Sequence, residues 1–437
     1  MAGLGLLKRY KDSTHVGAPF VQGRVAGVTG SLLEGFAAGA AVGDLYRVGG
    51  DDGPGAWAEV VALRDDKVLM VPYGAISGIR IGDALLPQGG ASQIPVSEQM
   101  LGRVLNALGQ PMDRKGSLPV DEYRKVYGEP LPALERRQVN ERMCTGVRVL
   151  DTFVPAGKGQ RLGIFAGPGV GKSVLMGMIA RASTADVIVM ALVGERGREV
   201  GHFIHEILGV EGLKRSVLVV ATSDKPANER VRAAFVATTI AEYFRDKGAD
   251  VVLFVDSLTR FAMGQREVGL AVGEPPTTKG YPPSVFSMLP KLLERVSPSL
   301  DRGTITGLYT VLVEGDDMTD PVADAAKGLL DGHVSLSRDL ANRGQYPAVD
   351  VLSSISRVET EIATHDELLQ TRKLRNWIAT IEDSQDLISI GAYRKGMNPE
   401  LDMALTKSDG IKGFMMQDIH EIAPLDDTLQ RLRTVAN

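Results

Sequence analysis

The sequence is poor in cysteine, in long apolar runs and in excess charge of either sign. Its 437 residues include one cysteine, Cys144, which excludes an internal disulfide and a cysteine-based zinc site. No apolar run approaches the roughly 20 residues that a membrane-spanning helix needs. The formal net charge of −5 gives no electrostatic basis for nucleic acid as the main partner. These features argue against a disulfide-stabilised, a membrane-spanning and a nucleic-acid-binding protein.

The overall composition is that of a multidomain globular protein. Hydrophobic residues make up 44% of the chain and charged residues 24%, values that argue against disorder. A length of 437 residues predicts two or three domains at roughly 150 residues each. Lys8, Arg9 and Lys11 follow a short apolar patch, but no long apolar core with a cleavage site comes after them. We therefore expect an uncleaved, cytoplasmic chain.

The stretch RLGIFAGPGVGKS, residues 161–173, has the pattern of a P-loop: an apolar strand, a glycine-rich turn and the start of a helix. The backbone N–H groups of such a loop cradle phosphates, Lys172 can reach the β- and γ-phosphates, and Ser173 can offer a hydroxyl to Mg²⁺. Ala166 replaces the first glycine of the pattern, which we expect to be tolerated because the later glycines supply the amides. The predicted nucleotide-binding residues are Ala166, Gly167, Pro168, Gly169, Val170, Gly171, Lys172, Ser173 and Val174.

Changes of pattern along the chain divide it into four segments. Residues 1–15 are a candidate docking segment, for which a frayed terminus is the alternative. Residues 16–88 hold short apolar runs separated by glycines and predict a small β-sandwich or barrel. Residues 89–358 begin with a proline-rich connection and continue as alternating strands and helices, the pattern of a parallel sheet covered on both faces. Residues 359–437 predict a helical C-terminal domain.

Acidic residues follow two of the predicted strands of this sheet. Asp256 ends one apolar strand, where a carboxylate at the strand tip could hold Mg²⁺ through its water shell. Glu195 and Arg196 follow another strand at the same sheet edge, where a carboxylate could polarise an attacking water. A solvated Glu–Arg pair is the alternative interpretation. The five expected strands are residues 161–167, 185–194, 216–224, 250–257 and 304–315.

Eight motifs, in their order and approximate spacing, resemble those of the rotary-type ATPases. They are AGPGVGKS, GERGREV, AEYFRD at 241–246, DSLTRFA at 256–262, GYPPSVF at 280–286, DDMTDP at 316–321, QYPAVD at 345–350 and SISRV at 354–358. The resemblance covers nearly the whole chain from about Gly17 onward. It implies a homohexamer whose subunits each have an N-terminal β-barrel, a central RecA-like α/β P-loop domain and a C-terminal α-helical domain.

The resemblance also implies roles for individual residues. Lys172 and Ser173 match positions that bind phosphate and Mg²⁺, and Asp256 matches a residue of the metal shell. Glu195 matches the base that activates water, and Arg196 matches a neighbouring electrostatic support. ATP is therefore the expected substrate and Mg²⁺ the expected cofactor.

Two further residues match positions of the family outside the P-loop and the strand tips. Tyr346 in QYPAVD matches the residue whose ring packs on adenine, with a core aromatic beside Pro347 as the alternative. Arg357 in SISRV matches an arginine finger that reaches across a subunit boundary to the γ-phosphate, with a surface arginine as the alternative.

Within this family the chain most resembles the export ATPases of type III secretion, and among them the flagellum-specific branch. GERGREV, DSLTRFA and IGAYRKG at 390–396 carry this resemblance, and the acidic DELSEED segment of the catalytic synthase subunit is absent. The resemblance implies ATP-driven export of flagellar proteins across the inner membrane from its cytoplasmic face. It implies as partners a regulatory stator-like protein, which binds the extreme N-terminus, the export-gate membrane proteins and complexes of substrates with chaperones.

Other functions remain as alternatives. Injectisome ATPases of type III secretion share nearly all these motifs, and rotary synthase subunits share many of them. A Rho-like nucleic-acid motor would need a basic, aromatic face on the N-terminal domain, and residues 16–88 contain no such series. A nucleotide-binding subunit that does not turn over would be distinguished by measuring phosphate release.

Overall fold

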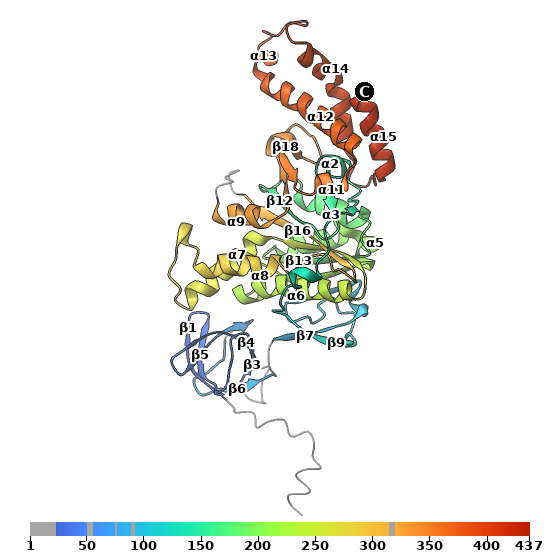
Figure 1. The fold of residues 1–437 in the computed structure, drawn as a ribbon. Helices are drawn as coiled ribbons and strands as arrows, with labels where there is room; N and C mark the ends of the chain where they lie inside the picture. The colour runs from blue at the N-terminus through green and yellow to red at the C-terminus, as the bar shows by residue number, and fades with distance from the viewer. Residues whose placement is uncertain (1–22, 50–55, 75–76, 89–91, 314–319) are drawn as a thin grey trace, which may run out of the picture. The chain divides into compact units, whose positions relative to one another are not determined.

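The computed structural model describes residues 23–49, 56–74, 77–88, 92–313 and 320–437. It divides into two units, one running to Ser92 and including Leu270–Glu274, the other holding Gln93–Gly269 and Pro275–Asn437 (Figure 1). The predicted docking segment lies outside the described residues. None of the helices in the described ranges is long and apolar enough to cross a membrane. The domain boundaries drawn from the sequence stay predictions.

The first unit contains a closed six-stranded antiparallel barrel, which confirms the β-structure predicted here. Its strands pair in the order β1-β2-β5-β4-β3-β6. Side chains such as Leu33, Met70 and Leu85 fill the interior and are fully buried. A β-carbon at Gly35 would stand 2.5 Å from Cδ1 of Leu85, so the barrel requires glycine there. The strands are β1 Gly23–Thr29, β2 Leu32–Phe36, β3 Leu45–Val48, β4 Ala56–Arg64, β5 Lys67–Tyr73 and β6 Ala84–Pro87.

The second unit is built on an eight-stranded sheet with the order β18-β17-β12-β16-β15-β13-β14-β8. The side chains of β13 alternate between two separate apolar cores. Val189 and Ala191 belong to the core on one face of the sheet, and Met190 and Leu192 belong to the core on the other. This double burial explains the continuous apolar runs in the sequence. The five predicted strands are all present, as β12 Arg161–Ala166, β13 Val187–Val193, β14 Ser216–Ala221, β15 Asp250–Asp256 and β16 Thr304–Leu312.

Three strands of this sheet were not expected, and one of them departs from the parallel pattern. β8 Arg103–Leu105 adds to the sheet from the proline-rich connection. β17 Gly332–Leu336 pairs in parallel with β12, and β18 Val349–Ser356 then runs antiparallel to β17 at the edge. These strands carry serine and charged residues or are very short, so they lack the apolar run that marks the central strands. Two small sheets join β7 Gln93–Val96 to β9 Glu122–Lys125 and β10 Arg142–Met143 to β11 Ala156–Gly157.

Helices cover both faces of the sheet. The P-loop helix α3 Lys172–Ala182 packs on one face, and the long helix α6 Ala227–Asp246 packs on the other. A π-helix, η3 Phe203–Leu208, joins α4 to α5. The other helices are α2 Arg148–Phe153, α4 Gly197–His202, α5 Gly209–Lys214, α7 Leu258–Ala271, α8 Pro283–Leu293, α9 Pro321–Leu329 and α10 Arg338–Asn342, with 3-10 turns η1 Glu98–Met100, η2 Ala133–Glu135 and η4 Thr278–Gly280.

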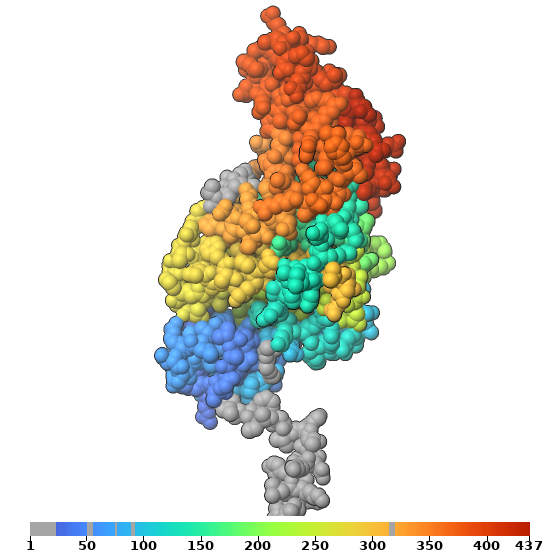
Figure 2. All heavy atoms as spheres, viewed as in Figure 1, coloured from blue at the N-terminus to red at the C-terminus, as the bar shows by residue number. Residues whose placement is uncertain are grey.

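The C-terminal region is helical, as predicted from its spacing. Thr364 caps α12 by accepting a hydrogen bond from the Glu367 N–H, and Asn398 caps α14 in the same way. Leu374, Trp377 and Leu432 bury their side chains between these helices and the sheet unit. In the space-filling view the helices form one continuous group of atoms, orange to red (Figure 2). They are α11 Glu359–Ile362, α12 His365–Asp383, α13 Gln385–Ser389, α14 Pro399–Met415 and α15 Leu425–Ala436.

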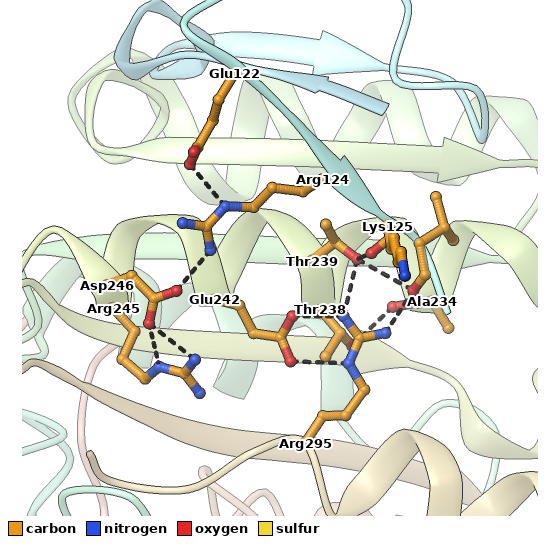
Figure 3. Close-up of polar contacts among 11 residues, drawn as sticks. Glu122, Arg124, Lys125, Ala234, Thr238, Thr239, Glu242, Arg245, Asp246 and Arg295 are labelled. Atoms are coloured by element: carbon orange, nitrogen blue, oxygen red, sulfur yellow. Dashed lines mark hydrogen bonds and ion pairs between the residues drawn. The ribbon is translucent and has the colours of Figure 1, made fainter. Parts of the chain in front are cut away.

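A buried arginine fastens the proline-rich connection to α6 (Figure 3). Arg295 is fully buried, and its Nε and Nη2 donate to the two carboxylate oxygens of Glu242 at 2.8 and 2.5 Å. Its Nη1 donates to the Val126 carbonyl at 2.5 Å, just beyond β9. A second arginine, Arg124 on β9, bridges to Asp246 at the end of the same helix at 2.7 Å. The connection is thus held to α6 by charge-assisted hydrogen bonds.

Replacing Arg295 with Met should destabilise the second unit strongly. The change leaves the Glu242 carboxylate without its partner in a mostly buried site, which costs about 3 kcal/mol or more. Urea unfolding followed by circular dichroism would measure the loss. Adding Glu242→Leu should recover part of it, while Arg302→Ala, at a half-exposed arginine near Asp246, should have little effect. Equal stability of Arg295→Met and the wild type would contradict the role given to this pair.

Candidate active site

The P-loop joins the end of β12 to the start of α3. Gly169 and Gly171 have φ angles of 79° and 92°, a left-handed conformation that side chains disfavour, and Gly171 is the N-cap of α3. Val170 is buried and anchors the loop, whereas Pro168 and Gly169 are exposed. The loop amides and the positive end of α3 therefore lie together at the carboxyl edge of the sheet, where an anion can bind.

Lys172 lies between two carboxylates at this edge. Its Nζ is 2.5 Å from Oδ1 of Asp256 and 3.6 Å from Oε1 of Glu195. β13 and β15 are neighbours with Leu192 opposite Asp256, so the segment after β13 carries Glu195 over the tip of β15. All three side chains are largely buried, at 11%, 5% and 18% exposure for Lys172, Asp256 and Glu195. The structure thus brings together the P-loop lysine and both predicted carboxylates.

The environment of Glu195 makes it a better base than an ordinary carboxylate. Burial, and next the negative charge of Asp256, raise the pKa of Glu195 to about 6, while Lys172 opposes the shift. A carboxylate with a raised pKa is still ionised at neutral pH and accepts a proton more readily. Glu195 therefore combines the position and the basicity that activation of a water molecule requires.

Two residues at this edge were not singled out by the sequence. Thr310 on β16 is fully buried, and its Oγ1 donates to Oδ1 of Asp256 at 2.6 Å, which fixes the carboxylate. The signal was a threonine two residues before the end of an apolar strand. Arg260, one turn into α7, packs its aliphatic stem over Gly194, and its buried Nε has no hydrogen-bond partner within the described residues. It lies inside the quoted motif DSLTRFA, and no role was assigned to it.

Tyr346 lies beside the P-loop. Carbons Cδ1 and Cε1 of its ring are 3.7 Å from the place where a β-carbon on Gly171 would stand, and 44% of the residue is exposed. An exposed ring next to the start of α3 is available to a ligand, which disfavours the core alternative. The ring position is compatible with the adenine contact that the sequence predicts for Tyr346.

The other two predicted residues do not lie at this cluster within one chain. The Arg196 side chain is 69% exposed and is 3.5 Å from Glu199 on the same helix. Arg357 follows the last residue of β18, Ser356, which pairs with Gly332 at the opposite end of β17 from the P-loop edge. Four residues of β17 separate the two edges, roughly 13 Å along the strands. The exposed Arg357 guanidinium donates to the Lys327 carbonyl at 3.3 Å.

The residues present fit a Mg²⁺ ion bound together with a nucleotide. Ser173 follows Lys172 at the start of α3, and Asp256, whose Oδ1 is 2.5 Å from the Lys172 Nζ, offers a carboxylate nearby. Within the described residues no group of three or more histidine, cysteine or acidic side chains could hold a metal alone. Mg²⁺ usually retains waters and binds through one or two protein ligands plus substrate phosphates, which suits this sparse donor set.

This arrangement defines a P-loop nucleoside triphosphatase centre. It combines a P-loop, an aspartate at a strand tip that pairs with the P-loop lysine, and a glutamate with a raised pKa after the neighbouring strand. Comparison with known proteins narrows this class. Residues 146–356 match the model of the ATP synthase alpha/beta family, nucleotide-binding domain, and residues 363–434 match that of the T3SS EscN ATPase C-terminal domain.

Individual relatives match over almost their whole length. The flagellum-specific ATP synthase of Bacillus subtilis is 48% identical over 94% of each chain. The type 3 secretion system ATPase of Xanthomonas euvesicatoria is 44% identical over 95% of this chain and 94% of its own. The structure of assembled EscN with its central stalk EscO, from enteropathogenic E. coli, matches with a TM-score of 0.88 at 41% identity, over 95% of this chain and 100% of that one. The chain belongs to the ATP synthase alpha/beta family, in the branch of flagellum-specific and type III secretion ATPases.

The raised pKa of Glu195 predicts the acid limb of the pH–rate profile. If Glu195 must be ionised to act as a base, kcat/KM should fall about tenfold per pH unit below pH ~6, and not below ~4.5 where an unperturbed glutamate titrates. Initial rates of phosphate release between pH 4.8 and 8, in buffers of constant ionic strength, would measure this limb. Glu195→Asp and Thr310→Val both alter this cluster. If the acid limb of the rate profile stayed at pH 6 in both variants, the group that titrates there would not be Glu195.

Proposed function

We propose that this chain hydrolyses ATP with Mg²⁺ and thereby energises or gates the export of flagellar proteins across the inner membrane. The observation that carries the proposal is the arrangement of Lys172 between Asp256 and Glu195 beside the P-loop. The family of the chain supports the same activity, because its relatives in this branch are named flagellum-specific ATP synthase and type 3 secretion system ATPase.

The proposed reaction is in-line attack of a water molecule on the γ-phosphorus of ATP, which breaks the bond from that phosphorus to the bridging β-phosphate oxygen and releases ADP and inorganic phosphate. The P-loop amides and the Lys172 ammonium hold the phosphates, and Tyr346 stacks on the adenine. Glu195 orients the water and accepts its proton. Thr310 fixes one oxygen of Asp256, so that the other can face the metal's water shell. Ser173 and, through water, Asp256 would hold a Mg²⁺ ion, which would neutralise charge on the phosphate oxygens.

The position of Arg357 supports an active site completed by a neighbouring subunit. Its sheet edge lies opposite its own P-loop, so the guanidinium cannot serve the nucleotide of the same chain. In a ring with head-to-tail interfaces, one edge of a subunit faces the P-loop edge of the next. We therefore assign Arg357 to stabilising charge on the γ-phosphate held by a neighbour in a homohexamer. Arg196, at 69% exposure, supports the same interface from the other side.

The proposed partners follow from the same branch. An EscN relative is assembled and binds a central stalk, which supports self-association and a regulatory partner for this chain. We propose association with the cytoplasmic face of the inner membrane, and contacts to a stator-like regulator through residues 1–15, to the export gate and to substrate–chaperone complexes. Because one relative is named type 3 secretion system ATPase, export of injectisome effectors is the alternative for the same chemistry.

Two variants test the ATPase proposal. Lys172→Ala removes the charge that faces the β- and γ-phosphates and should abolish most ATP turnover. Glu195→Gln keeps the shape of the side chain but lowers its basicity, and should reduce kcat by ~10²-fold or more. Phosphate release and nucleotide binding are measured on folded, assembled protein. Glu195→Gln should bind ATP about as well as the wild type. If its affinity fell in step with kcat, Glu195 would be a binding residue.

A mixing experiment tests the assignment of Arg357. Lys172→Ala and Arg357→Ala are each expected to be inactive, and equal amounts are allowed to co-assemble. If Arg357 acts on a neighbour, about one interface in four pairs an intact Lys172 with an intact Arg357, so phosphate release should return at a fraction of the wild-type rate. Native mass spectrometry would show whether the rings contain both variants. If mixed rings had no activity, the assignment of Arg357 to a single neighbouring site would be rejected.

A further inference from the structure

The link between α14 and α15, residues 416–424, is bonded to the nucleotide-binding part of the unit at several points. We call this segment the connector. Gln417 donates its backbone N–H to the Tyr346 carbonyl at 3.0 Å, and its buried side chain bonds the Arg148 N–H and the Gly146 carbonyl, both at 2.8 Å. The Arg148 guanidinium donates to the Met416 carbonyl at 2.6 Å and pairs with Glu421. The connector is therefore bonded both to Tyr346, beside the P-loop, and to Gly146 and Arg148.

One side chain joins this connector directly to the P-loop helix. Arg181 lies in the last turn of α3, eight residues after Ser173. Its Nη2 donates to the Ile419 carbonyl in the connector, and its Nη1 donates to the Ile207 carbonyl in the π-helix η3. That π-helix continues α4, which begins two residues after Glu195. A single guanidinium thus contacts three elements: α3, the helix that follows the proposed base, and the connector.

Burial lowers the pKa of Arg181, and backbone carbonyls are the groups that offset the cost of burying this cation. Arg181 has no carboxylate partner within the described part of the chain. It lies instead at the carboxyl end of α3 and beside the last turn of η3. Both helix ends carry a partial negative charge, so the guanidinium stabilises them together. Loss of the cation would leave the Ile207 and Ile419 carbonyls without this donor.

Close packing makes α3 and its surroundings move together. A β-carbon at Gly177, in the middle of α3, would stand 2.1 Å from Cγ2 of Ile207, so the helix touches η3 without a gap. A β-carbon at Gly146 would stand 2.4 Å from Cβ of Ala182, just past Arg181. A shift of α3 along or across its axis must therefore displace η3 and the loop around Gly146.

We propose that Arg181 is a positioning residue that couples nucleotide binding at the P-loop to the C-terminal helices through the connector. Phosphate binding acts on the first turn of α3, and the helix, being rigid, transmits the displacement to Arg181. Its two hydrogen bonds pass it to η3 and to Ile419, and from there to α14 and α15. This inference rests on the proposed function, because it takes the P-loop as the nucleotide site.

Hydrogen exchange with a non-hydrolysable nucleotide tests the coupling. In the wild-type protein, AMP-PNP with Mg²⁺ should slow exchange of the amides of residues 416–423 several-fold, in addition to those of residues 167–173. In Arg181→Met the slowing at residues 167–173 should remain and that at residues 416–423 should disappear. With ATP, kcat should fall roughly fivefold with KM within twofold, because the phosphate cradle is intact. Slowing of residues 416–423 that persists in Arg181→Met would overturn the proposal, as would its absence in the wild type.

The matched control is Lys214→Met, at the end of α5. Lys214 is also a cation close to η3 in the chain, but its side chain is 66% exposed, and among the described residues it pairs with Glu211 at 2.7 Å. This variant should keep the nucleotide-dependent slowing at residues 416–423. Arg181→Lys retains the charge but carries only one ammonium for two carbonyls, and should recover part of the effect. Loss of the slowing in Lys214→Met as well would show general loosening and would reject a specific role for Arg181.

A second pair of variants keeps the test decisive if Arg181→Met does not fold. Gly177→Ala should push α3 away from Ile207 and uncouple residues 416–423, because the added β-carbon would stand 2.1 Å from Cγ2 of Ile207 and 3.3 Å from Nη1 of Arg181. Ile207→Ala in the same chain should restore the coupling by making room. Failure of the double variant to restore it would contradict the proposed path. The exchange assay needs binding only, so a wild-type chain that bound AMP-PNP without hydrolysing ATP would refute the proposed function and leave the coupling testable.

Discussion

The register of the parallel sheet is the constraint on which the site depends. β12, β13, β15 and β16 all end at one edge, so the P-loop, Glu195, Asp256 and Thr310 meet there although about 140 residues separate the first from the last. A slip of one residue in any pairing would turn side chains to the other face and separate these groups. The apolar cores on both faces of the sheet hold the register, because the buried apolar residues of these strands alternate between the two cores.

Much of this arrangement could be predicted from the sequence because the central strands are continuous apolar runs. Apolar runs such as DVVLFVD are long enough to indicate buried strands, and Asp256 stands directly at the tip of one. The edge strands could not be recognised. β18 exposes Leu352, Ser353 and Ile355 and contains three serines, so its sequence resembles a loop. Its antiparallel direction depends on the return of the chain after α10.

The site was predictable in composition but not in geometry. The motifs supplied Lys172, Glu195 and Asp256, yet only the fold shows Lys172 bridging the two carboxylates. Thr310 escaped notice because one threonine in a strand is ordinary, and its importance comes from a neighbour 54 residues away in the chain. Arg357 and Arg196 have no contact with the cluster in a single chain, since their proposed targets belong to another subunit. Sequence motifs identify candidate residues, but their contacts depend on pairing between strands that lie far apart in the chain.

The charge balance around Lys172 has a consequence for ligand choice. One ammonium faces two carboxylates, and a pKa raised to about 6 leaves Glu195 mostly ionised at neutral pH. Lys172, Asp256 and Glu195 together therefore carry a net charge of about −1, before the Arg260 guanidinium at the same edge is counted. A bare polyphosphate approaching the loop would meet repulsion from Glu195 and Asp256 and would compete with them for Lys172. A nucleotide that arrives with its divalent cation brings the missing positive charge. The paired carboxylates thus disfavour an uncomplexed anion at the loop relative to a nucleotide that carries its metal.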